Sequence, residues 1–169
     1  MNLDSTARPL LIRSAAPADH EAIWEIFREV VSREDSFVFD PKTSRQEALA
    51  YWSQPGAHTF VATDESGVIG SYIVKANQPG LGSHVANAGF MVAQRAQHRG
   101  VGRAMAEHCL AEAVRLGFRA MQFNFVVSTN HSAIALWESL GFAIVGTLPL
   151  AFRNRDLGFV DVYVMFRSL

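Results

Sequence analysis

Residues 97–102, Gln-His-Arg-Gly-Val-Gly, are the part of the sequence whose types and spacing most directly indicate chemistry. Glycine lacks a Cβ atom, so Gly100 and Gly102 let the backbone approach a ligand and point successive N–H groups at it. A helical pattern follows at once, from about Val101 to Leu116, and the N-terminus of a helix attracts anions. The turn therefore predicts a binding site for phosphate groups.

Two common phosphate motifs do not describe this turn. No Gly-Lys-Ser/Thr of a Walker loop follows it, and Met105 stands where a dinucleotide fingerprint has its third glycine. A second segment, Asn-His-Ser-Ala-Ile-Ala-Leu-Trp-Glu-Ser-Leu-Gly-Phe at 130–142, narrows the choice. Together the two segments resemble the GNAT acetyltransferase superfamily, whose acetyl-CoA loop reads Gln/Arg-x-x-Gly-x-Gly/Ala and whose later helix reads Asn-x-x-Ala-x-x-Leu-Tyr-x-x-x-Gly-Phe. The matching residues are Gln97, Gly100, Gly102, Asn130, Ala133, Leu136, Gly141 and Phe142.

This resemblance implies the α/β GNAT fold, a mixed, mostly antiparallel twisted sheet of about six to seven strands with splayed central strands and helices on both faces. The alternation of strand and helix patterns agrees with it. Strands are expected at 10–12, 59–63, 68–75, 84–93, 121–127, 142–148 and 158–166, and helices at 18–31, 101–116 and 132–140. Another helix should begin at the capping box of Ser44 and Glu47 and end before Pro55.

Length and composition predict one domain over residues 1–169 with a sizeable core, since 49% of the residues are apolar. The net charge of −1 and the absence of Lys/Arg runs argue against a nucleic-acid or membrane partner. Cys109 is the one cysteine, which favours a reducing compartment such as the cytoplasm. Met1 to Pro9 lacks the apolar centre of a signal peptide, and no apolar run approaches the ~20 residues that span a bilayer.

Acetyl-CoA is the co-substrate that the resemblance implies, with no metal. Backbone N–H groups of the turn would hold its pyrophosphate, and Arg99 or Arg103 could add charge. Met91 and Val92 would pair with the pantetheine arm through their backbones, as an added strand. Asn130 can cap the helix that it opens, contact the pantetheine arm, or do both. The full predicted acetyl-CoA set is Met91, Val92, Gln97, His98, Arg99, Gly100, Val101, Gly102, Arg103, Asn130 and Trp137.

The residues expected to bind and deprotonate the acceptor amine follow the family pattern less closely than those expected to bind acetyl-CoA. The strand at 84–93 contains no carboxylate to act as a base, although His84 could deprotonate an ammonium, directly or through water, if it is not simply a surface residue. Asn87 and Asn124 are polar residues in strands, and each amide must be satisfied by a substrate or by a neighbouring strand. Phe37 and Phe39 make the loop at 32–43 unusually apolar, which suggests that it covers the substrate.

Other reactive residue types have simpler explanations. Cys109 lies within a helical pattern and is expected in the core. His98, His108 and His131 show no metal-ligand spacing and should be solvated or satisfied by neighbours. Trp137 occupies the position of a family Tyr that is thought to protonate the departing thiolate, and an indole N–H cannot act as an acid.

The segments at 87–89, 124–127, 130–137, 146–153 and 158–161 are similar to acetyltransferases that detoxify L-azetidine-2-carboxylate, where a Trp at position 137 is expected. That likeness assigns Asn87 to substrate recognition, Asn124 to positioning the reactants and Asn130 to acetyl-CoA. Phosphinothricin-type amino-acid acetyltransferases share the same outline. We therefore predict a small-molecule N-acetyltransferase that acts by direct transfer on an amino acid or analogue, and the resemblance allows a homodimer. The alternatives are a peptide or protein N-acetyltransferase and a non-catalytic acyl-CoA-binding domain.

Overall fold

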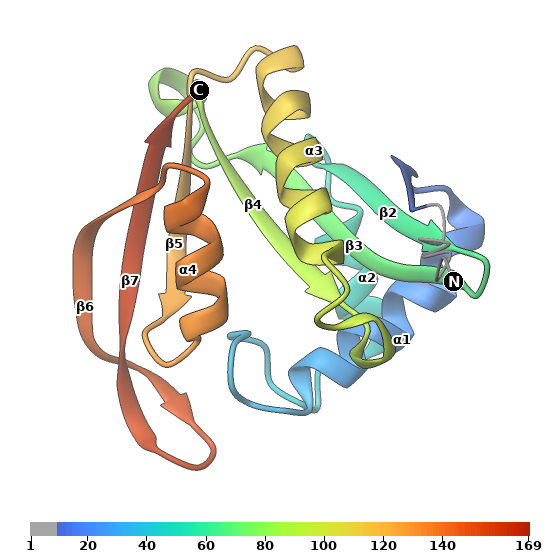
Figure 1. Ribbon diagram of the computed structural model, residues 1–169, viewed down its shortest axis with the longest axis horizontal. Coiled ribbons are helices and arrows are strands. Elements are labelled where there is room, and N and C mark those ends of the chain that lie inside the picture. The colour runs from blue at the N-terminus through green and yellow to red at the C-terminus, as the bar shows by residue number, and fades with distance from the viewer. Residues whose placement is uncertain (1–9) are drawn as a thin grey trace, which may run out of the picture.

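The computed structural model describes residues 10–169 as one seven-stranded sheet with helices against both faces (Figure 1). The strand order is β1-β2-β3-β4-β5-β7-β6, and every neighbouring pair is antiparallel except β4 and β5. This confirms the predicted mixed, mostly antiparallel sheet. The features predicted for Met1 to Pro9 lie outside the described residues. The strands are β1 (Leu11–Ser14), β2 (His58–Asp64), β3 (Gly67–Ala76), β4 (Val85–Val92), β5 (Ala120–Val127), β6 (Ala143–Asn154) and β7 (Gly158–Ser168).

Side-chain alternation along the strands divides the core into two layers. Helices α1 (His20–Val31) and α2 (Arg45–Trp52) pack on one face, where Ile73 is buried. Helices α3 (Val101–Arg115) and α4 (His131–Ser139) pack on the other, where Tyr72 is buried. Short 3-10 turns span Pro17–Asp19, Gly80–Gly82 and Gln94–Ala96. Within residues 10–169, no helix is both long and apolar enough to cross a membrane.

Most elements lie close to their predicted positions. The capping box is confirmed, because Ser44 Oγ accepts a hydrogen bond from the Glu47 N–H (3.2 Å) and the Glu47 carboxylate accepts one from the Ser44 N–H (2.8 Å). The first helix is shorter than predicted, since its first turn is the 3-10 segment at 17–19.

The clearest correction concerns β6, which was predicted to end at Leu148 and continues to Asn154. Its pairing with β7 shifts register between Leu148 and Phe152. Pro149, which has no N–H, and Leu150, with φ of 52°, lie in this irregularity. Such residues interrupt a central strand, but β6 is at the edge of the sheet, where a bulge accommodates them.

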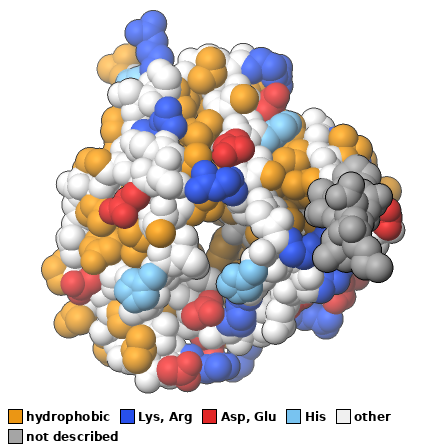
Figure 2. All heavy atoms as spheres, in the orientation of Figure 1, with side chains coloured by type: hydrophobic (Ala, Val, Ile, Leu, Met, Phe, Trp, Pro, Cys, Tyr) orange, Lys and Arg blue, Asp and Glu red, His pale blue; other side chains and the backbone are white. Residues whose placement is uncertain are grey.

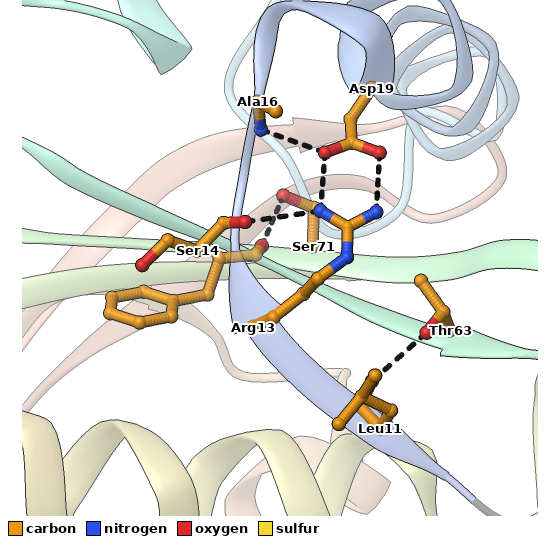
Figure 3. A network of polar contacts seen from close by, with 8 residues as sticks. Leu11, Arg13, Ser14, Ala16, Asp19, Thr63 and Ser71 are labelled. Atoms are coloured by element: carbon orange, nitrogen blue, oxygen red, sulfur yellow. Dashed lines mark hydrogen bonds and ion pairs between the residues drawn. The ribbon is translucent and has the colours of Figure 1, made fainter.

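Asp19 connects the first strand to the first helix (Figure 3). Arg13 on β1 donates two hydrogen bonds to the Asp19 carboxylate, Nη1 to Oδ2 (2.7 Å) and Nη2 to Oδ1 (2.9 Å), and the Ala16 N–H donates a third (2.8 Å). The Asp19 side chain is only 8% exposed, so these donors replace lost water. The hydrogen bonds from Arg13 hold the pKa of Asp19 below its ordinary value.

We expect Asp19→Ala to lower the free energy of unfolding by about 1.5–3 kcal/mol at pH 7, because it removes charge-assisted hydrogen bonds. The Asp19 pKa is lowered in the folded state, so its contribution is present above the unfolded carboxyl pKa and is lost as pH falls through the folded pKa. Denaturant titrations should therefore show the variant and wild type converging below about pH 4. Glu25→Ala, which breaks an exposed pair with Arg28, is the control and should cost less than about 1 kcal/mol. Equal losses in the two variants would contradict the prediction.

Candidate active site

The strands β4 and β5 pair for two residues and then separate (Figure 1). Val85 pairs with Ala120 and Ala86 with Met121. Beyond that point β4 pairs only with β3, and β5 only with β7, among the strands of residues 10–169. The predicted splay is therefore confirmed, and it leaves the facing edges of β4 and β5 open.

Asn87 lies at the point of separation. Its Nδ2 donates a hydrogen bond to the Gln122 carbonyl on β5 (2.9 Å), which adds one link where backbone pairing ends. The sequence left open whether a substrate or a neighbouring strand satisfies the Asn87 amide, and in the structure the neighbouring strand does so. Asn87 also lines the cavity between the strands, so its carbonyl oxygen can still receive a ligand donor.

A cavity of about 950 Å³ lies between the separated strands. Phe37, Phe39 and Tyr51 line it from the α1–α2 side, while Leu136 and Trp137 line it from α4 on the other side. Figure 2 shows an opening near the middle of this face, through which hydrophobic side chains are visible. The size suits a cofactor, and the lining from both sides of the sheet provides room for two reactants.

The turn at 97–102 forms one end of this cavity. Gly100 has φ of 78° and precedes α3, whose first backbone hydrogen bond runs from the Ala104 N–H to the Gly100 carbonyl (3.0 Å). The amides of residues 101–103 precede that bond and are left to external acceptors. The turn residues that line the cavity are Gln97, His98, Gly100, Val101 and Gly102. This geometry is that of an anion site at a helix N-terminus.

The two arginines suggested for the phosphates are not among the cavity-lining residues. Arg99 forms an ion pair with Asp64 on β2 (Nη2 to Oδ2, 2.9 Å). Hydrogen bonds from Ser66 and Arg99 lower the pKa of Asp64 to about 2, which keeps the pair charged at neutral pH. Arg103 donates to Ser139 Oγ on α4 (2.8 Å). Both arginines therefore brace the turn, and their contact with phosphates stays a prediction.

Met91 and Val92 lie on the open edge of β4. The Met91 side chain is buried under α1 and α2, and Val92 packs against the opposite core layer. Both residues line the cavity, and the edge has no partner strand within residues 10–169. Backbone N–H and C=O groups on this edge can therefore pair with an extended, amide-rich ligand.

Helix α4 contributes Asn130 and Trp137. Asn130 Oδ1 accepts a hydrogen bond from the Ala133 N–H (3.3 Å), which confirms the helix-cap role; Asn130 also lines the cavity. Trp137 is 9% exposed, and its ring centroid lies 4.5 Å from that of Phe123 and 5.1 Å from that of Phe90. Trp137 is therefore an apolar wall of the cavity.

Asn124 is held by two other amide side chains. Its Nδ2 donates to Asn77 Oδ1 (2.6 Å), and its Oδ1 accepts from Gln122 Nε2 (2.8 Å). Asn124 and Asn87 both line the cavity, whereas the roles of Asn77 and Gln122 were not predicted. The network fixes the direction of the Asn124 amide without giving it a titrating partner.

His84 is not brought to the cavity. It is exposed, precedes the paired end of β4, and its backbone carbonyl accepts from the Arg119 N–H (2.8 Å). His84 is therefore a surface residue, which was the other possibility left open by the sequence, and the geometry gives no support to its predicted catalytic role.

His108 and Cys109 have the structural roles that were predicted for them. His108 is hydrogen-bonded to the Tyr72 hydroxyl (2.8 Å). Cys109 is fully buried, and this burial raises the pKa of its thiol.

Several further polar residues line the cavity and were not predicted, among them Arg33, Asp35, Asn154 and Asp156. Arg33 and Asp35 immediately precede the apolar run of the loop at 32–43, which was the signal that could have found them. Asn154 and Asp156 lie at the β6–β7 turn, beyond the predicted end of β6. Asp35 and Asp156 thus place two carboxylates in the cavity lining, whereas β4 has none. Within residues 10–169, no cluster of His, Cys, Asp and Glu could hold a metal ion.

Comparison with known proteins identifies the family. Residues 20–142 match the model described as "Acetyltransferase (GNAT) family". The chain belongs to the GNAT family. It is therefore a GNAT N-acetyltransferase, and acetyl-CoA is its co-substrate. The anion turn and the open edge of β4 fit the phosphate and amide groups of that molecule.

Two relatives and two solved structures show the likeness across the GNAT fold. The chain is 31% identical to the L-amino acid N-acetyltransferase AaaT of Escherichia coli over 94% of this chain and 97% of that protein. It is 38% identical to the N-acetyltransferase aca1 of Schizosaccharomyces pombe over 59% of this chain, which spans about half (48%) of that relative. A GNAT structure from Kribbella flavida has a TM-score of 0.90 at 46% identity, covering 95% and 98% of the two chains. A Sinorhizobium meliloti phosphinothricin acetyltransferase with bound acetyl-CoA has a TM-score of 0.84 at 26% identity, covering 95% and 88%.

We expect Gly100→Ala to weaken acetyl-CoA binding about tenfold, because a side chain at positive φ costs ~1–2 kcal/mol and the backbone would turn its amides away from the ligand. Gly56→Ala is a matched control, since Gly56 has φ of 79°, an equally open surrounding, and no place in the cavity lining. Both variants should lose similar stability in denaturant titrations. Calorimetric titration with acetyl-CoA should separate them, and equal affinities would argue against the anion turn.

Proposed function

We propose that this enzyme transfers the acetyl group of acetyl-CoA directly to the amine of a small amino acid or amino-acid analogue. The observation that carries the proposal is that two segments of the chain meet at one end of the cavity. The loop containing Phe37 and Phe39 and the β6–β7 turn both line it, and the Arg155 N–H donates to the Glu34 carbonyl (3.3 Å), which joins these two segments. A peptide acceptor would need an open groove at this place.

The named relatives support an amino-acid acceptor. The E. coli relative is an L-amino acid N-acetyltransferase, and the S. meliloti structure is a phosphinothricin acetyltransferase. The net charge of −1 gives the chain little attraction for nucleic acid or anionic lipid. Proline analogues such as L-azetidine-2-carboxylate are the narrower candidates, given the segments around Asn87, Asn124 and Trp137.

In the proposed reaction the neutral amine attacks the thioester carbonyl carbon, a C–N bond forms, and the C–S bond breaks. Asn124 orients the reactants, and Asn87 directs the amine with its free carbonyl oxygen. Asp35 or Asp156 receives the amine proton, directly or through water. The departing thiolate takes its proton from solvent, since Trp137 cannot supply one.

A panel assay of thiol release tests the proposal. Amino acids and azetidine-2-carboxylate should release CoA thiol from acetyl-CoA, and peptides should not. Faster turnover of peptides would favour the peptide alternative. Tight binding of acetyl-CoA with no release on any acceptor would favour the non-catalytic alternative.

We expect Asn124→Ala to lower kcat about tenfold or more while the Kd for acetyl-CoA is retained, since one positioning donor is lost. Asn77→Ala is the matched comparison, because Asn77 holds the Asn124 amide and does not itself line the cavity. Its loss of kcat should be smaller. An unchanged kcat in Asn124→Ala would remove Asn124 from the mechanism.

We also propose that two copies associate through the β6–β7 arm. Six of the exposed large hydrophobic residues lie on this arm, Ile144, Val145, Leu148, Leu150, Leu157 and Phe159. The arm ends the sheet with β6, whose outer edge is unpaired within residues 10–169. Exposed apolar side chains beside an open strand edge favour association.

We expect Val145→Glu to shift the protein from dimer to monomer in light-scattering measurements at micromolar concentration, because a charge would be buried in the apolar contact. Val114→Glu on α3 is the control, since Val114 (56%) and Val145 (60%) are similarly exposed. The control should keep the wild-type mass. A monomeric wild type, or loss of the dimer in both variants, would contradict the proposed interface.

A further inference from the structure

Arg33, in the loop after α1, has an unused guanidinium. Its Nε is buried and has no hydrogen-bond partner within residues 10–169. Its contact with Asp35 joins Nε to Oδ2 at 3.6 Å, which is too long for a hydrogen bond. The side chain is 32% exposed, so most of it is removed from water. The Nε atom is closed to solvent as well as unpaired, so a ligand would meet the guanidinium through its two Nη groups, for which the described residues provide no hydrogen-bond acceptor.

The other arginines of residues 10–169 are satisfied in one of two ways. Most donate hydrogen bonds to protein oxygens, as Arg13 does to Asp19 and Arg115 does to Glu112. Arg119 and Arg153 are exposed, where water can serve as the acceptor. Arg33 is thus the one partly buried arginine of the described chain whose guanidinium lacks a protein acceptor.

Arg33 also has a distinctive position. No other Lys or Arg of residues 10–169 lines the cavity. It precedes the Phe37–Phe39 segment and adjoins Glu34, whose carbonyl binds the β6–β7 turn. The planar guanidinium fork matches a carboxylate with two parallel N–H donors. Its position is therefore the acceptor end, beside the two segments that meet there.

We propose that Arg33 binds the carboxylate of the acceptor and thereby positions its amine. This inference rests on the proposed amino-acid acceptor and deepens it. In an α-amino acid the amine and carboxylate share one carbon, so anchoring the carboxylate fixes the reach of the amine toward the thioester. Asp35, at 3.6 Å, keeps the guanidinium oriented without occupying it.

Two ligands could bring anionic oxygens to Arg33, the acceptor through its carboxylate and acetyl-CoA through its phosphates. The phosphates already have the free amides of the turn at 97–102. Arg33 belongs instead to the loop that forms the acceptor wall. The acceptor carboxylate is therefore the source to which the inference commits.

The test compares Arg33→Met and Arg33→Lys with Arg45→Met, whose arginine forms an exposed ion pair with Glu21 outside the cavity lining. Acceptors are tested as matched pairs, L-leucine with L-leucinamide and L-azetidine-2-carboxylate with its carboxamide. For Arg33→Met, kcat/KM on the carboxylates should fall about 10- to 100-fold, as expected for a lost charge-assisted pair. On the amides it should change less than about threefold. Arg33→Lys should retain part of the carboxylate preference, and Arg45→Met all of it.

Three results would overturn the inference. These are equal losses on carboxylates and amides, an increased Kd for acetyl-CoA in Arg33→Met, or a wild-type enzyme that does not prefer carboxylates over amides. Each of these results would be compatible with an active N-acetyltransferase and would reject only the role of Arg33.

A binding measurement separates this inference from the proposed function. If the wild type acetylates no amino acid, the proposed function fails, and Arg33 is judged by titrating N-acetyl-L-leucine into the CoA-bound protein. Binding that is about tenfold weaker in Arg33→Met supports the carboxylate site. Equal binding, or none in the wild type, overturns it.

Discussion

Two parallel strands normally continue to hydrogen-bond along their length, yet β4 and β5 stay together for only two residue pairs. Each strand is held from its far side, β4 by β3 and β5 by β7, and a register shift between Phe123 and Val126 bends β5 along β7. Asn87 makes the last link across the junction. This separation creates the open strand edge and the cavity, and the cavity extends to the anion turn that follows β4.

The two ends of the cavity are built differently. The end that we expect to bind acetyl-CoA offers backbone groups, the amides after Gly100 and the open edge of β4, and Arg99 and Arg103 beside it are bound to other protein groups. The end that we propose for the acceptor is lined by side chains from separate parts of the chain, among them Arg33, Asn87 and Asn124. A backbone site depends on conformation more than on residue identity. Acceptor preference can therefore change by substitution while the acetyl-CoA site is preserved.

The same difference explains which parts of the site the sequence could predict. The anion turn and the Asn130 cap are local, because glycine spacing and helix capping act within a few residues. The separation of β4 and β5 was predicted only from the family resemblance, because no short sequence pattern marks the residue at which two strands stop pairing. Asn77 and Asp156 were missed because the elements that bring them to Asn124 and the cavity lie far away in the sequence.

Two expectations show the limits of local patterns. His84 was considered as a base because its strand has no carboxylate, but a strand pattern does not reveal which of its ends opens, and the cavity lies toward the other end of β4. The predicted strand at 142–148 ended just before Pro149, whereas an edge strand can continue past a proline after a bulge.

The cavity passes through the sheet rather than into one face of it, since side chains of both core layers line it. A lining drawn from both layers gives room for acetyl-CoA and an acceptor at the same time, as the proposed direct transfer requires. Direct transfer needs no nucleophile to hold the acetyl group between two half-reactions, which agrees with a fully buried Cys109.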